Sequence, residues 1–191
     1  MSGEHRRTIE DVLRLVCDYL NQNNIPYVIV GAIAVCVYGN PRATSDIDFV
    51  LLLEKEKLKE FAVFLRKNDF FSSPEDAEDA LRERSHFTPI DKISLLRLDI
   101  KGVYSEMDRR AITSRRAITY HGTNLFLASP EDTIASKLWY GREKDIEDIE
   151  GIYVRQLHNL DMRYLETACA MLGVLGDLNK MRQKVKRYME K

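Results

Sequence analysis

The stretch Asp46-Ile47-Asp48-Phe49-Val50-Leu51 decides the fold. It reads as a strand, in which residues two apart point to the same face. Asp46 and Asp48 then lie side by side, while Ile47 and Phe49 face a core. Two carboxylates this close repel each other. A shared divalent cation with a preference for oxygen ligands, Mg²⁺ or Mn²⁺, would remove that cost. The alternative is an edge strand with two solvated aspartates.

The residues before this strand favour a shared cation over two solvated aspartates. Tyr27–Val30 reads as a short buried strand that ends at Gly31, and 32–38 as a small apolar helix. Exposed N–H groups at the start of a helix attract phosphate, and glycine lets the phosphate approach the backbone closely. An ordinary strand-to-helix turn would use the glycine equally well. The combination of this turn and the paired carboxylates predicts a nucleotide site.

Other segments give the outline of the chain. Hydrophobic periodicity predicts helices at 8–22 and 55–68, and alternation predicts a strand at 93–103. Segments 116–120 and 124–128 flank His121-Gly122-Thr123 as a hairpin. Ser129-Pro130-Glu131-Asp132 is a strong helix start, and the rest reads as helical. Segment 71–84 fits no element clearly. The fold class expected is α/β (α+β), with a core at 1–128 and a helical region at 129–191.

Composition restricts the class of protein. The 191 residues carry 29 basic and 30 acidic side chains, so the net charge gives no sign of attraction to nucleic acid or membrane. The longest apolar stretch, 27–38, is too short to span a bilayer. Three widely separated cysteines indicate reduced thiols in a cytoplasmic protein. Trp139 and Tyr140 are interpreted as core or helix-packing residues, and a platform for stacking of a base is the alternative.

These motifs resemble the DNA polymerase β-like nucleotidyltransferase superfamily, whose pattern is a hydrophobic residue, Gly, Gly or Ser, and then Asp-h-Asp/Glu-h. Here it reads Val30-Gly31-Ala32 and, thirteen residues later, Asp46-Ile47-Asp48-Phe49. The resemblance is closer to the minimal AbiEii-like enzymes, which include toxins of type IV toxin–antitoxin systems. It rests on Gly31, Ala34, Gly39, Pro41, Arg42, Thr44 and the two aspartates, and on the motif from Ser129 to Leu138 with Gly141–Ile149. Ala32 departs from the pattern, since it offers no hydroxyl to a phosphate.

The resemblance implies a nucleotidyltransferase fold and the transfer of an NMP from an NTP to an acceptor hydroxyl. It also implies a third carboxylate, for which we expect Asp99, because Arg97, Asp99 and Lys101 alternate with apolar residues. A salt bridge within that face is the alternative role of Asp99. Asp91 and Asp108 are weaker candidates. Asp46, Asp48 and Asp99 are thus the expected catalytic residues and the ligands of Mg²⁺ or Mn²⁺.

The same resemblance predicts residues that bind the nucleotide: Gly31, Ala32, Arg42, Thr44, Ser45 and Lys137. Arg42 is equally consistent with a solvated loop, and Thr44 with a residue that only fixes that loop. Lys137 would contact phosphate or, as the alternative, pair with Glu131 or Asp132. The basic cluster Arg109, Arg110, Arg115 and Arg116 would bind phosphates of the acceptor or be a solvated charge run.

Several partners fit these expectations. The nucleotide is an NTP, and the acceptor is a tRNA, a protein or a small molecule. The AbiEii-like resemblance adds a possible cognate antitoxin. A catalytically degenerate module that binds nucleotide or a partner protein is the alternative to an active enzyme.

Overall fold

The computed structural model describes residues 7–120 and 122–190, so His121 lies outside the described part. It divides the chain into two compact units. The first, here called the sheet unit, comprises the chain up to Val30 together with Thr44–Leu127. The second, the helical unit, comprises Gly31–Ala43 and the chain from Ala128 onward. The chain crosses from the first unit to the second after Leu127, and residues 31–43 group with the helices. The division into a core at 1–128 and a helical region at 129–191 stays a prediction.

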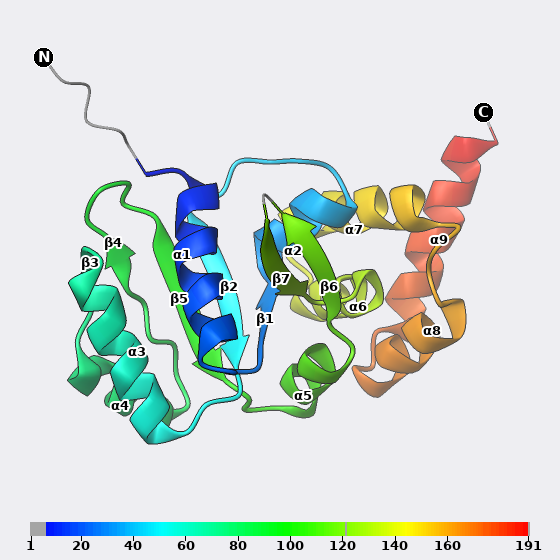
Figure 1. Cartoon of the computed structure of the whole chain (residues 1–191). Helices are drawn as coiled ribbons and strands as arrows, with labels where there is room; N and C mark the ends of the chain where they lie inside the picture. Colours follow the sequence, from blue (N-terminus) through cyan, green and yellow to red (C-terminus); the bar gives the residue numbers. More distant parts are fainter. Residues whose placement is uncertain (1–6, 121, 191) are drawn as a thin grey trace, which may run out of the picture. The chain divides into compact units, whose positions relative to one another are not determined.

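The sheet unit contains a mixed sheet of seven strands among the described residues, in the order β3-β4-β5-β2-β1-β7-β6 (Figure 1). The strands are β1 (Tyr27–Val30), β2 (Asp46–Leu51), β3 (Phe70–Phe71), β4 (Ile90–Asp91), β5 (Arg97–Gly102), β6 (Arg116–Tyr120) and β7 (Thr123–Leu127). Strand β2 runs antiparallel to β1 and parallel to β5. The predicted hairpin is formed by β6 and β7. The expected fold class is confirmed.

Four helices accompany this sheet in the described residues: α1 (Ile9–Gln22), α3 (Lys55–Lys67), α4 (Pro74–Glu83) and α5 (Glu106–Thr113). Helix α1 begins at a capping box between Thr8 and Asp11, as the sequence predicts. Its side chains Val12, Leu13, Val16, Cys17 and Leu20 are buried, and the helix packs against β7. Burial of one Val or Leu side chain contributes about 1.5–3 kcal/mol, so this stripe fixes the helix on the unit.

The alternation of β2 and β5 determines where the polar groups lie. Ile47, Phe49, Leu98 and Ile100 are at most 3% exposed. Because successive strand residues face opposite sides, Asp46 and Asp48 share the other face with Arg97 and Asp99. The core therefore fixes the register that brings the charged residues together.

The helical unit contains α2 (Gly31–Tyr38), α6 (Pro130–Tyr140), α7 (Glu143–Gln156), α8 (Met162–Met171) and α9 (Leu175–Met189). Ser129 caps α6 by accepting a hydrogen bond from the backbone N–H of Asp132 at 3.0 Å. Helix α6 packs against α7 and α8, and α2 packs against α6 and α7. A helical C-terminal part was expected, and it is present.

Two segments differ from the expectation. Residues 71–84, which fit no element, hold the end of β3 and then α4 with Ser73 as its N-cap. The strand expected from residue 93 begins only at Arg97, because residues 92–94 form a turn and Leu95 adopts a positive φ of 65°. Within the described residues, no helix is long and apolar enough to cross a membrane.

Candidate active site

Three aspartates share one face of two neighbouring strands of the sheet unit. Asp48 of β2 and Asp99 of β5 are direct partners in the parallel register, and Asp46 is the partner of Arg97. Adjacent strands lie about 4.8 Å apart, so these side chains leave the same face at close range. The sequence predicted both the shared face of Asp46 and Asp48 and the position of Asp99. The register adds that Asp99 lies opposite Asp48.

Arg97 bridges two of these carboxylates. Its Nε lies 3.3 Å from Oδ1 of Asp46, and its Nη2 lies 3.3 Å from Oδ2 of Asp99. Thr88 also donates its hydroxyl to Oδ1 of Asp99 at 3.0 Å. The side chains of Asp46 and Asp99 are 41% and 21% exposed, so a ligand from solvent can reach both.

The donor set fits a hard divalent cation. Three carboxylates on one face supply the oxygen ligands that Mg²⁺ prefers. In the positions described for residues 7–120 and 122–190, however, no three His, Cys, Asp or Glu side chains converge closely enough to hold a metal ion. Asp46 and Asp99 are turned to the guanidinium of Arg97. A shared cation therefore requires these side chains to rotate away from Arg97.

The residues before β2 fix the start of that strand. Thr44 donates its hydroxyl to the carbonyl of Asp46 at 3.0 Å and accepts from the backbone N–H of Asp46 at 3.2 Å. Ser45 donates its hydroxyl to Oδ1 of Asp46 at 3.3 Å. Thr44 therefore shapes the loop, as one of its two predicted roles requires. Contact of either residue with a nucleotide stays a prediction.

Gly31 begins α2 directly after β1. Val30, to which it is bonded, is the register partner of Asp48. The φ of Gly31 is +66°, a backbone conformation that L side chains adopt rarely, so the turn itself requires glycine. Ala32 follows at the first turn and is 7% exposed. Binding of phosphate by these two residues stays a prediction.

The rival carboxylates have structural roles. Asp91 is fully buried, and its Oδ1 lies 2.7 Å from the guanidinium of Arg7. Asp108 caps α5 in a capping box with Ser105 and lies 2.7 Å from the ammonium of Lys101. Burial alone would raise the pKa of Asp108, but the ion pair with Lys101 and these hydrogen bonds outweigh it and lower the pKa. Neither residue competes with Asp99 for a solvent-facing role.

A second charged cluster lies inside the helical unit. The ammonium of Lys137 lies 2.7 Å from Oδ1 of Asp145 and 2.8 Å from Oδ2 of Asp148, and all three side chains are at most 8% exposed. Nε of Arg42 lies 3.2 Å from the other oxygen of Asp148. Lys137 therefore does form an ion pair, but with α7 and not with Glu131 or Asp132. A role of Lys137 or Arg42 toward nucleotide stays a prediction.

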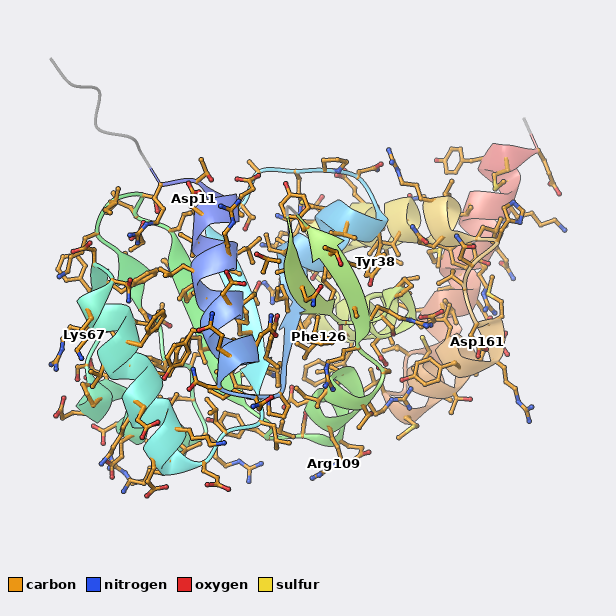
Figure 2. All side chains as sticks on the ribbon, viewed as in Figure 1. Asp11, Tyr38, Lys67, Arg109, Phe126 and Asp161 are labelled. Carbon is orange, nitrogen blue, oxygen red and sulfur yellow. The ribbon has the colours of Figure 1, made fainter. Side chains whose placement is uncertain are left out.

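The basic cluster of α5 and β6 is spread over different environments. Arg109 extends outward from α5, where its Nε lies 3.4 Å from the carboxylate of Glu106 (Figure 2). The guanidinium of Arg115 lies 4.9 Å from the ring centre of Phe126 and donates to the carbonyl of Ile112. These contacts match the interpretation of an ordinary charge run better than that of a phosphate site.

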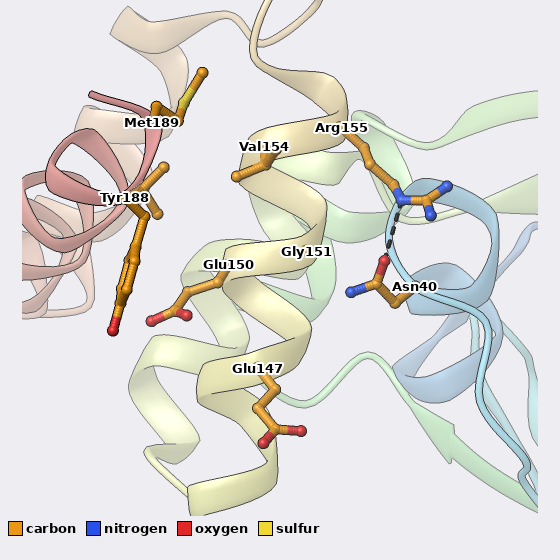
Figure 3. Close-up of a pocket in the computed structure, with 9 residues that line it drawn as sticks. Asn40, Glu147, Glu150, Gly151, Val154, Arg155, Tyr188 and Met189 are labelled. Atoms are coloured by element: carbon orange, nitrogen blue, oxygen red, sulfur yellow. Dashed lines mark hydrogen bonds between the residues drawn. The ribbon is translucent and has the colours of Figure 1, made fainter. Parts of the chain in front are cut away.

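A cavity of about 550 Å³ lies within the helical unit, between α7, α9 and the loop after α2 (Figure 3). Glu147, Glu150 and Val154 contribute from α7, and Tyr188 and Met189 from α9. Arg155 donates to Asn40 at 3.1 Å across one side of it. Two charged side chains of the cavity have partners within the protein: Arg155 bonds to Asn40, and the carboxylate of Glu150 lies 2.5 Å from the ammonium of Lys184.

Trp139 and Tyr140 do not pack as expected. Their exposed fractions are 52% and 47%, and the two rings form an edge-on pair with centres 5.1 Å apart. The guanidinium of Arg142 lies 5.1 Å from the ring centre of Tyr140. The interpretation of both residues as helix-packing residues is therefore wrong.

The sequence indicates no role for four of the residues that make these contacts. The alternation places Arg97 on the polar face of its strand without indicating its partners, and no motif marks Thr88. Asp145 and Asp148 carried a family motif, but their pairing with Lys137 spans two helices. The i,i+2 spacing of Arg97 and Asp99 was a usable signal for the first contact, because it places both on one face.

The sequence matches no protein-family model and no curated protein. The structure does resemble solved ones. A nucleotidyltransferase-like protein from Paracoccidioides brasiliensis superposes with a TM-score of 0.60 at 22% identity, covering 92% of this chain and 90% of that one. The antibiotic-resistance factor ANT(2'')-Ia superposes with a TM-score of 0.56 at 14% identity, covering 91% and 95%.

A third neighbour is the lincosamide antibiotic adenylyltransferase LnuA in its lincomycin-bound form. It superposes with a TM-score of 0.53 at 13% identity, covering 78% of this chain and 98% of that one. At these identities the likeness concerns the fold. The arrangement of sheet and helices described above is therefore the nucleotidyltransferase fold.

Proposed function

We propose that this chain is a metal-dependent nucleotidyltransferase that moves an NMP from an NTP to an acceptor hydroxyl. The observation that carries the proposal is the register of β2 and β5, which sets Asp48 opposite Asp99 with Asp46 on the same face. A fold shared with adenylyltransferases supports it. A purely structural role would not require three carboxylates on one solvent-accessible face.

In the proposed reaction the acceptor oxygen attacks the α-phosphorus, the bond from that phosphorus to the β-bridging oxygen breaks, and pyrophosphate leaves. Asp99 takes the proton of the hydroxyl on a carboxylate oxygen, or holds the hydroxyl for its loss to water. Asp46 and Asp48 would hold the divalent cations. Mg²⁺ bound there would neutralise the triphosphate and lower the pKa of the acceptor hydroxyl.

The acceptor is open between a small molecule, a tRNA and a protein. ANT(2'')-Ia has been solved with adenylyl-2''-tobramycin, and LnuA with lincomycin. Hydroxyl-bearing small molecules are therefore the first acceptors to test. Assignment to the AbiEii-like subtype, with a cognate antitoxin, rests on the two sequence motifs and stays a prediction.

The direct test is incubation with each labelled NTP, Mg²⁺ or Mn²⁺, and cell extract, followed by detection of labelled acceptor and of pyrophosphate. We expect transfer with at least one NTP and none from the Asp46→Asn, Asp48→Asn double variant. Arg82→Gln, a surface variant on α4, serves as the control. Nucleotide binding without any transfer or pyrophosphate release would instead identify a catalytically degenerate binding module.

A further inference from the structure

Arg97 holds an unusual place on the carboxylate face of β2 and β5. Two neighbouring register positions on this face carry four charged side chains: Asp46 opposite Arg97, and Asp48 opposite Asp99. Of these four, three are negative and Arg97 is positive. Lys101, two residues further along β5, is paired with Asp108. The guanidinium contacts one carboxylate on its own strand and one on the neighbouring strand, at 3.3 Å each. The guanidinium of Arg97 therefore neutralises the same carboxylates that a shared divalent cation would neutralise.

The backbone fixes this arrangement, although the Arg97 side chain is 48% exposed. The N–H of Arg97 donates to the carbonyl of Ser45 at 2.9 Å, which locks the start of β5 to the start of β2. Residues 97 and 99 share a face because they are two apart in a strand. Without a positive group, like charges at this spacing would destabilise the sheet.

We propose that Arg97 is a resident counter-ion of the carboxylate face, a positioning residue that competes with the divalent cation. In the nucleotide-free protein it pairs with Asp46 and Asp99 and keeps cation affinity low. When the cation binds, the guanidinium must release both carboxylates. The released fork remains beside the site, where its geometry suits phosphate oxygens. This inference rests on the proposed metal site.

The test uses Mn²⁺ alone, titrated into the nucleotide-free chain and followed by calorimetry or by the spin resonance of free Mn²⁺. Removing the competitor in Arg97→Gln should tighten Mn²⁺ binding, on the order of fivefold for partly exposed pairs at low salt. Arg97→Lys keeps the charge but loses the fork, so its affinity should lie between those of the wild type and Arg97→Gln. High salt should shrink the differences.

Two controls make the result specific. Arg82→Gln removes the same charge from the surface of α4, where Arg82 pairs with Asp79, and should leave Mn²⁺ affinity unchanged. The Asp46→Asn, Asp48→Asn double variant should lose Mn²⁺ binding. Thermal unfolding verifies that each variant is folded, and Arg97→Lys keeps the test open if Arg97→Gln does not fold.

The outcomes separate this inference from the proposed function. If both Arg97 variants bind Mn²⁺ no more tightly than the wild type while the double variant loses binding, the counter-ion role is overturned and the metal site stands. If the double variant binds Mn²⁺ as the wild type does, the metal site itself is refuted, and the role of Arg97 with it. If Arg82→Gln also bound Mn²⁺ more tightly than the wild type, the change in affinity would follow from the net charge of the protein alone. That result would also overturn the proposal.

Discussion

The ammonium of Lys137 lies 2.8 Å from Oδ2 of Asp148, and both side chains are at most 8% exposed. Asp145 contacts the same ammonium at 2.7 Å. Removal of one member of a buried pair leaves an uncompensated charge, which costs about 3–5 kcal/mol. We therefore expect Lys137→Ala to lower the free energy of unfolding by an amount in this range.

Urea unfolding measures this change, and Lys180→Ala is the matched control. Lys180 pairs with Asp177 at 2.9 Å, but its side chain is 81% exposed, so the loss should be about 1 kcal/mol or less. NTP affinity should be measured on the same folded samples. An unchanged stability of Lys137→Ala with weakened NTP binding would mean that Lys137 acts as a phosphate ligand, as the family resemblance implies.

Asp99→Asn should cut turnover by about a hundredfold or more, the scale of a positioned acid–base group, and change nucleotide affinity much less. Asp91→Asn and Asp108→Asn provide the comparison, because both carboxylates form structural ion pairs. These two variants should lose stability and keep turnover per folded molecule. Near-full turnover in Asp99→Asn, with loss in one of the others, would show that the third carboxylate is misassigned.

The pairing of Asp108 with Lys101 makes a pH-dependent contribution to stability. The folded pKa of Asp108 is lowered, so its stabilisation is complete above the unfolded pKa, about 3.9, and is lost as the pH falls through the folded pKa. We expect Asp108→Asn to be destabilised at pH 7 and the gap to the wild type to close in strong acid. Asp79→Asn, on the exposed surface of α4, should show little gap at either pH. A gap that persists unchanged into strong acid would contradict this assignment.

The two helices that begin with Ser-Pro-Glu-Asp show what sequence alone could give. Ser129–Asp132 predicts a helix start, and α6 begins there. Ser73–Asp76 has the same four residues, and α4 begins there, yet segment 71–84 fitted no element. The local signal for a helix start is equally strong in both segments. The start of α5 at the Ser105–Asp108 capping box could have been predicted in the same way.

The partners of the charged side chains could not be predicted from local sequence motifs. The shared face of Asp46 and Asp48 follows from strand periodicity, but the opposition of Asp48 and Asp99 depends on the register between two strands far apart in sequence. The partners of Lys137 depend on how α6 and α7 pack. The left-handed conformation of Leu95, which delays β5, conflicts with the local preference of leucine and is set by the turn after Asp91.

Close packing against α7 requires a glycine at position 39. A Cβ there would lie 2.9 Å from Cγ1 and 3.1 Å from the backbone nitrogen of Ile152 on α7, and 3.2 Å from the carbonyl oxygen of Val35. Gly39→Ala should therefore destabilise the chain by about 1–3 kcal/mol, the cost of overpacking. Gly176→Ala is the control, since a Cβ there meets nothing within 4 Å and the residue lies in α9.

Alanine at position 176 should be neutral or stabilise by about 0.5–1 kcal/mol, because glycine is a poor helix residue. Thermal or urea unfolding of both variants gives the comparison. Equal effects at the two positions would show that the loop after α2 does not approach α7 as described.

Trp139 is the only tryptophan of the chain, so its fluorescence reports on one position. With 52% of its surface exposed, it should be quenched by acrylamide in the native protein about half as efficiently as after unfolding in urea. Tyr140→Ala removes the ring that lies 5.1 Å away and should increase quenching, whereas Tyr188→Ala on α9 should not. A blue-shifted emission that resists acrylamide would show that the ring is covered in solution. Dilution then distinguishes two causes, because a second copy of the chain would release the ring at low concentration and packing within one chain would not.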